Sequence, residues 1–162
     1  MSASLVGSEM CIRDRYITEG QVVLDRNLHG QAIYPPISIL PSLSRLMKDG
    51  IGAGYTREDH QDLANQLFSA YAKVGEARNL ASVIGEDELS PIDKQYLKFG
   101  EEFEKRYIGQ DPKENRTILN TLDLGWELLG LLPKEELDRI DTKLVDKYYK
   151  KKEETDEEES ES

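Results

Sequence analysis

Hydrophobic residues recur every three or four positions through most of residues 56–149, and this period predicts amphipathic helices. Thr56 is the expected N-cap of the first helix, because acidic residues follow it in what would be the first turn. The apolar stripe of this helix is formed by Leu63, Leu67, Tyr71 and Val74. Residues 76–85 predict a short second helix.

Three further helices follow with the same period. Ser90 is the expected N-cap of the third, with Pro91 at the first helical position. Residues 117–132 predict the fourth helix, and Pro133 begins the fifth. The apolar faces of the third and fifth helices are formed by Ile92, Tyr96, Phe99, Phe103, Tyr107, Leu137, Ile140, Leu144 and Tyr148. Residues 51–150 therefore predict a mainly α fold, a bundle of about five helices.

The residues before the bundle have a different pattern. β-Branched residues around Gly20 predict a strand or a pair of strands in residues 16–25. Three prolines in residues 35–41 favour an extended backbone, and residues 42–49 predict a short helical turn. Because a lone strand is not stable by itself, we interpret residues 16–50 as the end of a sheet-containing domain that begins further upstream.

The two ends of the chain carry no such pattern. SLVGSEMCIRD, within residues 1–15, resembles the in-frame translation of a transposase adapter used in sequencing-library preparation. We therefore expect residues 1–15 to be a disordered artefact, in which case the single Cys11 carries no information about redox environment. Residues 151–162 are strongly acidic and have nothing to bury, so we expect a disordered tail.

The charge of the chain restricts its partners. The formal net charge is -11, and seven acidic residues among the last ten account for most of it, which leaves about -4 for the rest. Free nucleic acid and anionic membrane surfaces would repel such a chain, so neither is an expected partner. No apolar run approaches the length of a membrane-spanning helix.

Few residues suggest chemistry. The glycine-rich residues 50–56 precede a predicted helix, where anions bind favourably, but they lack the lysine of a phosphate-binding loop. A plain linker is the favoured interpretation. His29 and His60 have no neighbours at metal-ligand spacing, so we expect surface residues and no metal site. Nothing in the pattern describes an independent enzyme.

Arg45 is the one charged residue in PPISILPSLSRLM, which spans residues 35–47. Lys48 follows this segment directly. Its guanidinium cannot be deprotonated in a protein, so it needs an anion wherever it is buried. Two hypotheses remain open from the residues alone. Arg45 either pairs with a nearby Asp, its stem packed at an interface, or it is directed at a phosphate from a proline-braced turn.

The segment YITEGQVVLDRNLHGQAIYPPISILPSLSRLM, from Tyr16, closely resembles the non-catalytic B subunit of archaeal and vacuolar-type rotary ATPases. TREDHQDLANQLFSAYA, YLKFGEEFEKRYI and LDLGWELLGLLP continue the resemblance in register, over residues 16 to about 149. The resemblance implies that residues 16–50 end an α/β nucleotide-binding domain and that residues 51–150 form a C-terminal helical domain.

The resemblance also implies an assembly. Non-catalytic B subunits would alternate with catalytic A subunits in a hexamer around a central rotor stalk, with a peripheral stalk, at the cytoplasmic face of a membrane. ATP or ADP with Mg would bind at the subunit interfaces and not to this fragment alone. ATP synthesis or hydrolysis would be coupled to proton or sodium transport, and membrane contact would occur only through the ion-translocating sector.

In that family the arginine of the PSLSRLM motif reaches from B into the neighbouring catalytic site, and Arg45 occupies its position. The resemblance thus implies a trans-acting arginine. Tyr34, Pro35, Ser42 and Ser44 are expected to support the interface loop that carries it.

Two positions depart from the family pattern. Ala32 stands where a glycine is common, which is expected to alter a turn, and Tyr55 stands where a lysine is usual, which weakens any role of the glycine-rich loop. The alternative is a stand-alone acidic helical adaptor with no nucleotide role, whose tail binds a basic partner. An autonomous ATPase is disfavoured, because no phosphate-binding loop is present.

Overall fold

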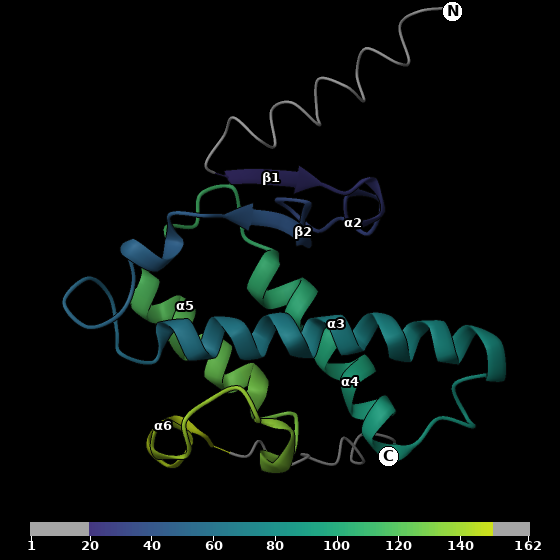
Figure 1. Cartoon of the computed structure of the whole chain (residues 1–162). Helices are drawn as coiled ribbons and strands as arrows, with labels where there is room; N and C mark the ends of the chain where they lie inside the picture. The colour runs from purple at the N-terminus through teal and green to yellow at the C-terminus, as the bar shows by residue number, and fades with distance from the viewer. Residues whose placement is uncertain (1–19, 151–162) are drawn as a thin grey trace, which may run out of the picture.

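The computed structural model describes residues 20–150, and Figure 1 shows a two-stranded hairpin beside a set of crossing helices. The hairpin segment, residues 20–49, contains β1 (Gly20–Leu24), α2 (Arg26–Gly30), β2 (Ile37–Ser44) and the 3-10 helix η1 (Met47–Asp49). The helical body, residues 57–150, contains α3 (His60–Ile84), α4 (Pro91–Glu102), the π-helix η2 (Phe103–Ile108), α5 (Ile118–Leu129), the 3-10 helix η3 (Lys134–Glu136) and α6 (Thr142–Tyr148).

In Figure 1 the long α3 crosses the middle of the molecule, between the hairpin and α6. The described residues contain five α-helices and one two-stranded sheet, so the prediction of a mainly α fold with about five helices is confirmed. None of these helices combines the length and the apolar content that a membrane crossing requires. The expected artefact at residues 1–15 and the expected tail at residues 151–162 lie outside the described residues.

β1 pairs antiparallel with β2, which lies outside the residues 16–25 in which a strand or a strand pair is predicted, and the pairing has an irregularity in the middle. The ladder begins with Gly20 opposite Ser44, and its register shifts before Val23, where β2 has extra residues. Pro41 lies among these extra residues, where its missing N–H breaks no regular ladder bond. The prediction of a helical turn from Ser42 onward is wrong at its start, because the strand continues to Ser44 and only η1 is helical.

Helix α3 is continuous where the sequence pattern predicts two helices. The expected break after Val74 does not occur, because Gly75 stays helical at a cost of only about 1 kcal/mol. Val74 and Ala77, on either side of this glycine, are both buried in the core and hold the two halves in line. The helix also begins later than predicted, with Asp59 rather than Thr56 at the N-cap position.

The predicted fifth helix is divided into η3 and α6. Between them the backbone is irregular, and the buried side chain of Gln66 satisfies it by donating to the Glu136 carbonyl and accepting the N–H of Arg139. These bonds replace the ones that a continuous helix would have made by itself. The predicted start of α4 is confirmed, because the Ser90 hydroxyl accepts the N–H of Asp93.

One hydrophobic cluster joins the helices to the hairpin segment. Its aromatic centre is Phe103, whose ring lies 4.9–5.5 Å from the rings of Tyr107, Tyr71 and Phe99. The hairpin segment contributes Leu28 and Ile33 to the same cluster, with Ile39 packed against it. These apolar contacts fasten the hairpin segment to the helical body, in addition to the chain connection.

Candidate functional site

Arg45 directly follows the last residue of β2, and its side chain is exposed. None of the ion pairs within residues 20–150 includes it. The local Asp partner, one of the two hypotheses from the sequence, is thus not found among the described residues. The guanidinium is presented at a strand end with its charge available to an external anion.

Ser42 closes the irregular part of the hairpin, three residues before Arg45. Its hydroxyl accepts the N–H of Val23 at 3.0 Å and donates to the Ser38 carbonyl at 2.5 Å. The side chain therefore replaces a backbone carbonyl in the strand pairing. Ser44 takes part through its backbone, opposite Gly20, where a Cβ would lie only 2.8 Å from a β2 carbonyl oxygen. Both serines lie on the strand that ends at Arg45.

Tyr34 and Pro35 lie before the other end of β2. The paired part of β2 runs alongside the five residues of β1, so its two ends lie about 13 Å apart. The Tyr34 side chain is 56% exposed, and the Tyr34 carbonyl accepts the N–H of Gln110 at 2.6 Å. The structure thus does not bring Tyr34 and Pro35 next to Arg45; they are connected to it through the strand.

The glycine-rich residues 50–56 form an irregular link between the hairpin segment and α3. Gly52 and Gly54 have φ values of +100° and +96°, which favour glycine, and Tyr55 is 74% exposed. The Thr56 hydroxyl accepts the N–H of Gly52 and lies 3.0 Å from Nδ1 of His60. Burial lowers the pKa of His60 below its ordinary value, so this imidazole is neutral at pH 7.

A cluster that the sequence analysis missed lies where the helical body begins. Asp59 is fully buried and accepts hydrogen bonds from Arg57 Nε at 2.6 Å, Arg57 Nη2 at 2.9 Å and the Trp126 indole N–H at 2.5 Å. Arg57 also donates to Asp123 and lies 4.7 Å above the Tyr148 ring. Burial alone would raise the pKa of Asp59, but these donors outweigh it and hold the pKa below its usual value.

The signal for this cluster was Trp126, because a buried indole N–H needs an acceptor. Asp59 is one of the acidic residues that the sequence pattern places in the first turn of the helix after Thr56. The same cluster ties α5 and α6 to the start of α3, since Asp123 and Trp126 lie on α5 and Tyr148 on α6. It is a structural clamp whose charges are neutralised within the chain.

A second buried carboxylate has a similar role. Glu104, in the π-helix, accepts both Nη atoms of Arg78 at 2.7 and 3.0 Å and the Tyr71 hydroxyl at 2.7 Å. Burial is the main cause that raises the pKa of Tyr71, and the Glu104 hydrogen bond adds to it. These residues join α3 to η2, and none of these hydrogen bonds includes Arg45.

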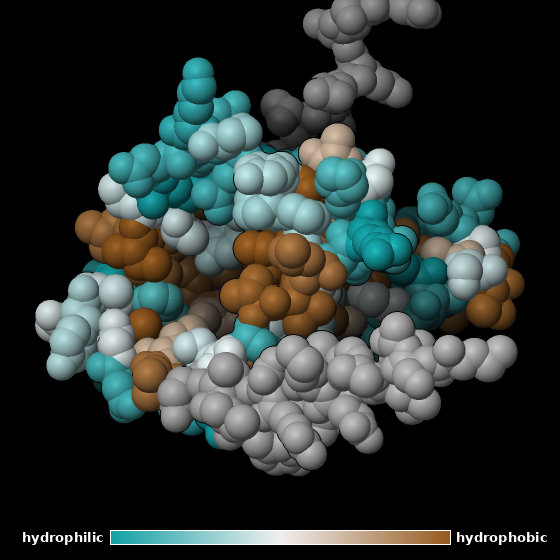
Figure 2. Space-filling model, turned by 90° about the horizontal axis from the view of Figure 1, so that it is seen from above, coloured by the Kyte–Doolittle hydropathy of each residue, from teal (hydrophilic) through white to brown (hydrophobic). Residues whose placement is uncertain are grey.

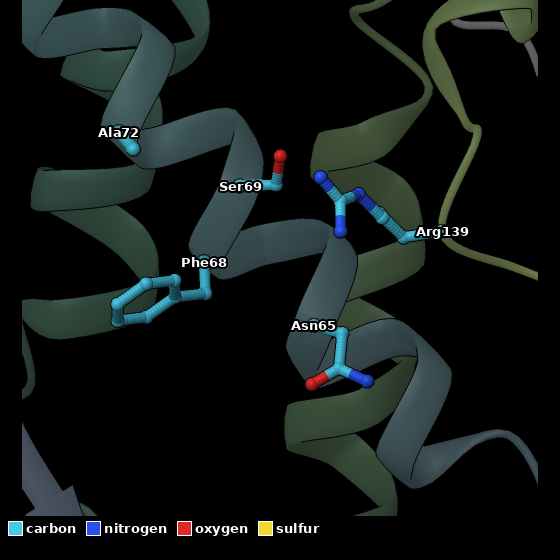
Figure 3. Close-up of a pocket in the computed structure, with 5 residues that line it drawn as sticks. All are labelled: Asn65, Phe68, Ser69, Ala72 and Arg139. Atoms are coloured by element: carbon cyan, nitrogen blue, oxygen red, sulfur yellow. The ribbon is translucent and has the colours of Figure 1, made fainter.

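Two open grooves are lined by described residues. The first, of about 520 Å³, is bordered by four residues of α3 and by Arg139. Figure 3 shows the Arg139 guanidinium extending toward α3 near Ser69 and Asn65, while Phe68 points to the other side of the helix. The second, of about 470 Å³, lies between residues 31–34 and residues 105–114. Arg45 lines neither groove.

The hairpin segment also exposes apolar side chains. Val22 and Leu24 on β1 are each 69% exposed, and Leu43 and Leu46 around the end of β2 are 42% and 58% exposed. Figure 2, which views the molecule from the hairpin side, shows hydrophobic side chains gathered near the centre of this face. Within residues 20–150, no three His, Cys, Asp or Glu side chains come together in a way that could hold a metal ion.

Comparisons with known proteins give a consistent result. Residues 49–149 match the family described as the C-terminal domain of V and A type ATP synthase. The chain is 62% identical over 135 residues to the V-type ATP synthase beta chain of Halothermothrix orenii, covering 83% of this chain and 29% of that protein. It is 58% identical over 134 residues to the B subunit of the A-type ATP synthase of Sulfurisphaera tokodaii, covering 83% and 29% respectively.

A solved structure agrees with these matches. The ATP synthase subunit NeqB from Nanoarcheaum equitans superposes with a TM-score of 0.67 at 47% identity, covering 73% of this chain and 29% of that one. The chain thus spans less than a third of the length of each of these relatives.

Proposed function

The chain belongs to the family of C-terminal domains of V and A type ATP synthases, and we propose that its Arg45 acts in trans at the ATP site of a neighbouring catalytic A subunit. The relatives are named as beta chains or B subunits, which supports the same identity for this chain. The stand-alone adaptor alternative loses its basis, because proteins that match over most of the chain are ATP synthase subunits.

The whole protein would work within a larger assembly. It would alternate with catalytic A subunits in a hexamer around a central rotor stalk, with a peripheral stalk, at the cytoplasmic face of a membrane. MgATP or MgADP would bind at the interfaces between subunits, and the reaction would be coupled to proton or sodium transport. The names of the relatives support membership in an ATP synthase complex.

One observation carries the arginine proposal: Arg45 is exposed and forms no ion pair with any of the described residues. A guanidinium presents a planar fork of donors that matches phosphate oxygens, and its charge would stabilise negative charge that develops on the γ-phosphate. Arginines supplied across an interface in this way raise turnover by about a thousandfold or more.

The support for the arginine would come from its own strand. Ser42 holds β2 against β1 three residues before Arg45, and Ser44 extends the pairing to the residue next to it. Tyr34 and Pro35 would act at the other end of the strand, through the tie to Gln110. We assign these residues the orientation of the backbone rather than contact with nucleotide.

The hairpin would form part of the C-terminal end of a nucleotide-binding domain. Residues 16–50 of this chain would be that end, and the rest of the domain would precede them in the whole protein. A two-stranded sheet is marginal by itself, and the exposed apolar side chains of β1 and β2 are the kind that further strands would cover. Residues 51–150 would form the helical domain of the same protein.

The test is Arg45→Ala in the full-length protein, assembled with its partners. Steady-state ATP hydrolysis should fall about a thousandfold or more, while the yield of assembled complex stays at the wild-type level, because the side chain makes no ion pair within the described part of its own chain. Near-normal turnover in the assembled variant would overturn the proposal.

A further inference from the structure

The N-terminal end of β2 is tied to the helical body by a backbone hydrogen bond between two turns. The N–H of Gln110 donates to the Tyr34 carbonyl at 2.6 Å. The surrounding junction is apolar, with Ile33 and Ile108 both buried in the shared cluster. This bond therefore fixes the point at which the strand that leads to Arg45 begins.

The turn that supplies this N–H is held by several bonds within the helical body. Gly109 closes the π-helix by donating to the Glu104 carbonyl at 2.9 Å, and a Cβ at Gly109 would overlap the Lys105 carbonyl. Arg116, whose side chain is 11% exposed, donates to the carbonyls of residues 106 and 107 and forms an ion pair with Glu114 at 2.8 Å. π-Helices are rare and occur frequently at functional sites.

The chain from Tyr34 to Arg45 has little freedom to absorb a displacement. Three of its residues are prolines, which have a fixed φ, and the Pro36 carbonyl accepts the N–H of Asp25 at 2.9 Å. Pairing with β1 holds both ends of the strand, and the Ser42 hydroxyl bridges the extra residues between them. A change in the position of Tyr34 would then reach the far end of the strand through these bonds.

Arg45 forms no ion pair with any of the described residues, so no such contact holds its side chain in place when the backbone moves. Its placement depends on the backbone that carries it. We propose that the Gly109–Gln110 turn of the helical domain positions Arg45 for the catalytic site, through the hydrogen bond to Tyr34 and the bonds that hold strand β2. Gln110 is thus a positioning residue through its N–H, and this inference rests on the trans role proposed for Arg45.

The experiment uses the assembled complex with the full-length form of this protein and compares Gln110→Pro with Gln110→Ala. Proline removes the N–H, and Gly109 already has φ -64° and ψ 127°, a conformation that a following proline accepts. Alanine keeps the N–H and changes only an exposed side chain. Gln110→Pro should lower kcat about tenfold to a hundredfold with an unchanged KM for ATP, because small misplacements of a catalytic group cost rates of that order. Gln110→Ala should match the wild type.

The same pair is then made in the Arg45→Ala background. If the turn acts through Arg45, Gln110→Pro should lower the residual rate less than twofold there. An equal loss with and without Arg45, or equal kcat values for the proline and alanine variants, would overturn the inference while leaving the trans arginine intact. A normal rate for Arg45→Ala itself would instead defeat the proposed function.

A second variant tests the same turn if Gln110→Pro assembles poorly. Gly109→Ala keeps every N–H but forces the turn to shift, because the new Cβ cannot fit against the Lys105 carbonyl. It should lower kcat per assembled complex in the same way. Failure of both variants to assemble would count against the inference, since the turn would then serve folding rather than the placement of Arg45.

Discussion

Two arginines only twelve positions apart in the chain have opposite environments. Arg57 donates to Asp59 and Asp123 and lies over the Tyr148 ring, so that its charge is neutralised inside the helical body. Its hydrogen bond to Asp59 is the main cause that raises the pKa of this guanidinium further above its usual value. Arg45 is exposed at the end of a strand and has no carboxylate of residues 20–150 in ion-pair range.

The difference separates a structural cation from one that would serve a partner under the proposed function. A buried charge has to be paired within the chain, because an unpaired one would cost several kcal/mol. An exposed guanidinium at a strand end meets no such requirement, and its donors are accessible to another molecule. The comparison therefore makes distinct predictions for the helical body and for the hairpin segment.

The largest effect is expected from replacing each arginine by lysine in the assembled complex. Arg45→Lys should lose most of the thousandfold or greater effect on turnover with no change in thermal stability, because a point charge cannot replace the planar fork. Arg57→Lys should lower the melting temperature and leave kcat per assembled complex near the wild-type value. ATPase assays and thermal unfolding of the same preparations measure both. Equal behaviour of the two variants would remove the distinction between them.

Removing the carboxylate of the clamp should destabilise the protein. Asp59→Ala leaves the Arg57 guanidinium and the Trp126 N–H without their buried acceptor, so the free energy of unfolding should fall by about 3–5 kcal/mol. Urea unfolding of the purified protein measures this loss. Asp49→Ala is the matched control, because Asp49 is exposed in η1 and forms no ion pair within the described residues. A similar loss in both variants would contradict the clamp.

The clamp also predicts a dependence of stability on pH. The pKa of Asp59 in the folded chain lies below its ordinary value of about 3.9, so its ionised form stabilises the fold at pH values above that. The stabilisation is lost as the pH falls through the folded pKa. Unfolding free energies measured from about pH 5 downward should therefore decrease more steeply for the wild type than for Asp59→Asn. Parallel curves would show that Asp59 is not held in its ionised form by the clamp.

The smallest effect concerns the backbone of the hairpin segment. Ala32 has φ +59°, in the left-handed region that disfavours residues with a Cβ. Ala32→Gly should therefore raise the free energy of unfolding by about 0.5–1 kcal/mol without changing turnover. Chemical denaturation detects a change of this size. A destabilised variant would show that Ala32 gains more from its side chain than it loses from its backbone.

The sequence predicted the type of most elements correctly and several of their limits incorrectly. Ser90 and Pro91 marked the start of α4 through local chemistry, which does not depend on the rest of the fold. Gly75 did not end α3, because buried neighbours on both sides kept the helix in place. The division after η3 depends on Gln66, some seventy positions earlier in the chain, and no local pattern indicates that contact.

The candidate site was predictable to a different degree. Arg45 was indicated by its isolation in an apolar segment and by the resemblance to a family motif. Only the structure shows that Arg45 is exposed and that it forms no ion pair with any of the described residues. The clamp around Asp59 was missed because its members are brought together from α3, α5 and α6. The tie from Gln110 to Tyr34 is a backbone bond, for which side-chain identity gives no signal.

The most direct test is an experimental structure of the assembled complex with an ATP analogue in a catalytic site. The trans role of Arg45 predicts that its guanidinium lies within hydrogen-bond distance of the γ-phosphate held by the neighbouring A subunit, with Arg57 still bound to Asp59. An Arg45 side chain directed away from the nucleotide, and paired with a carboxylate of its own chain, would contradict it.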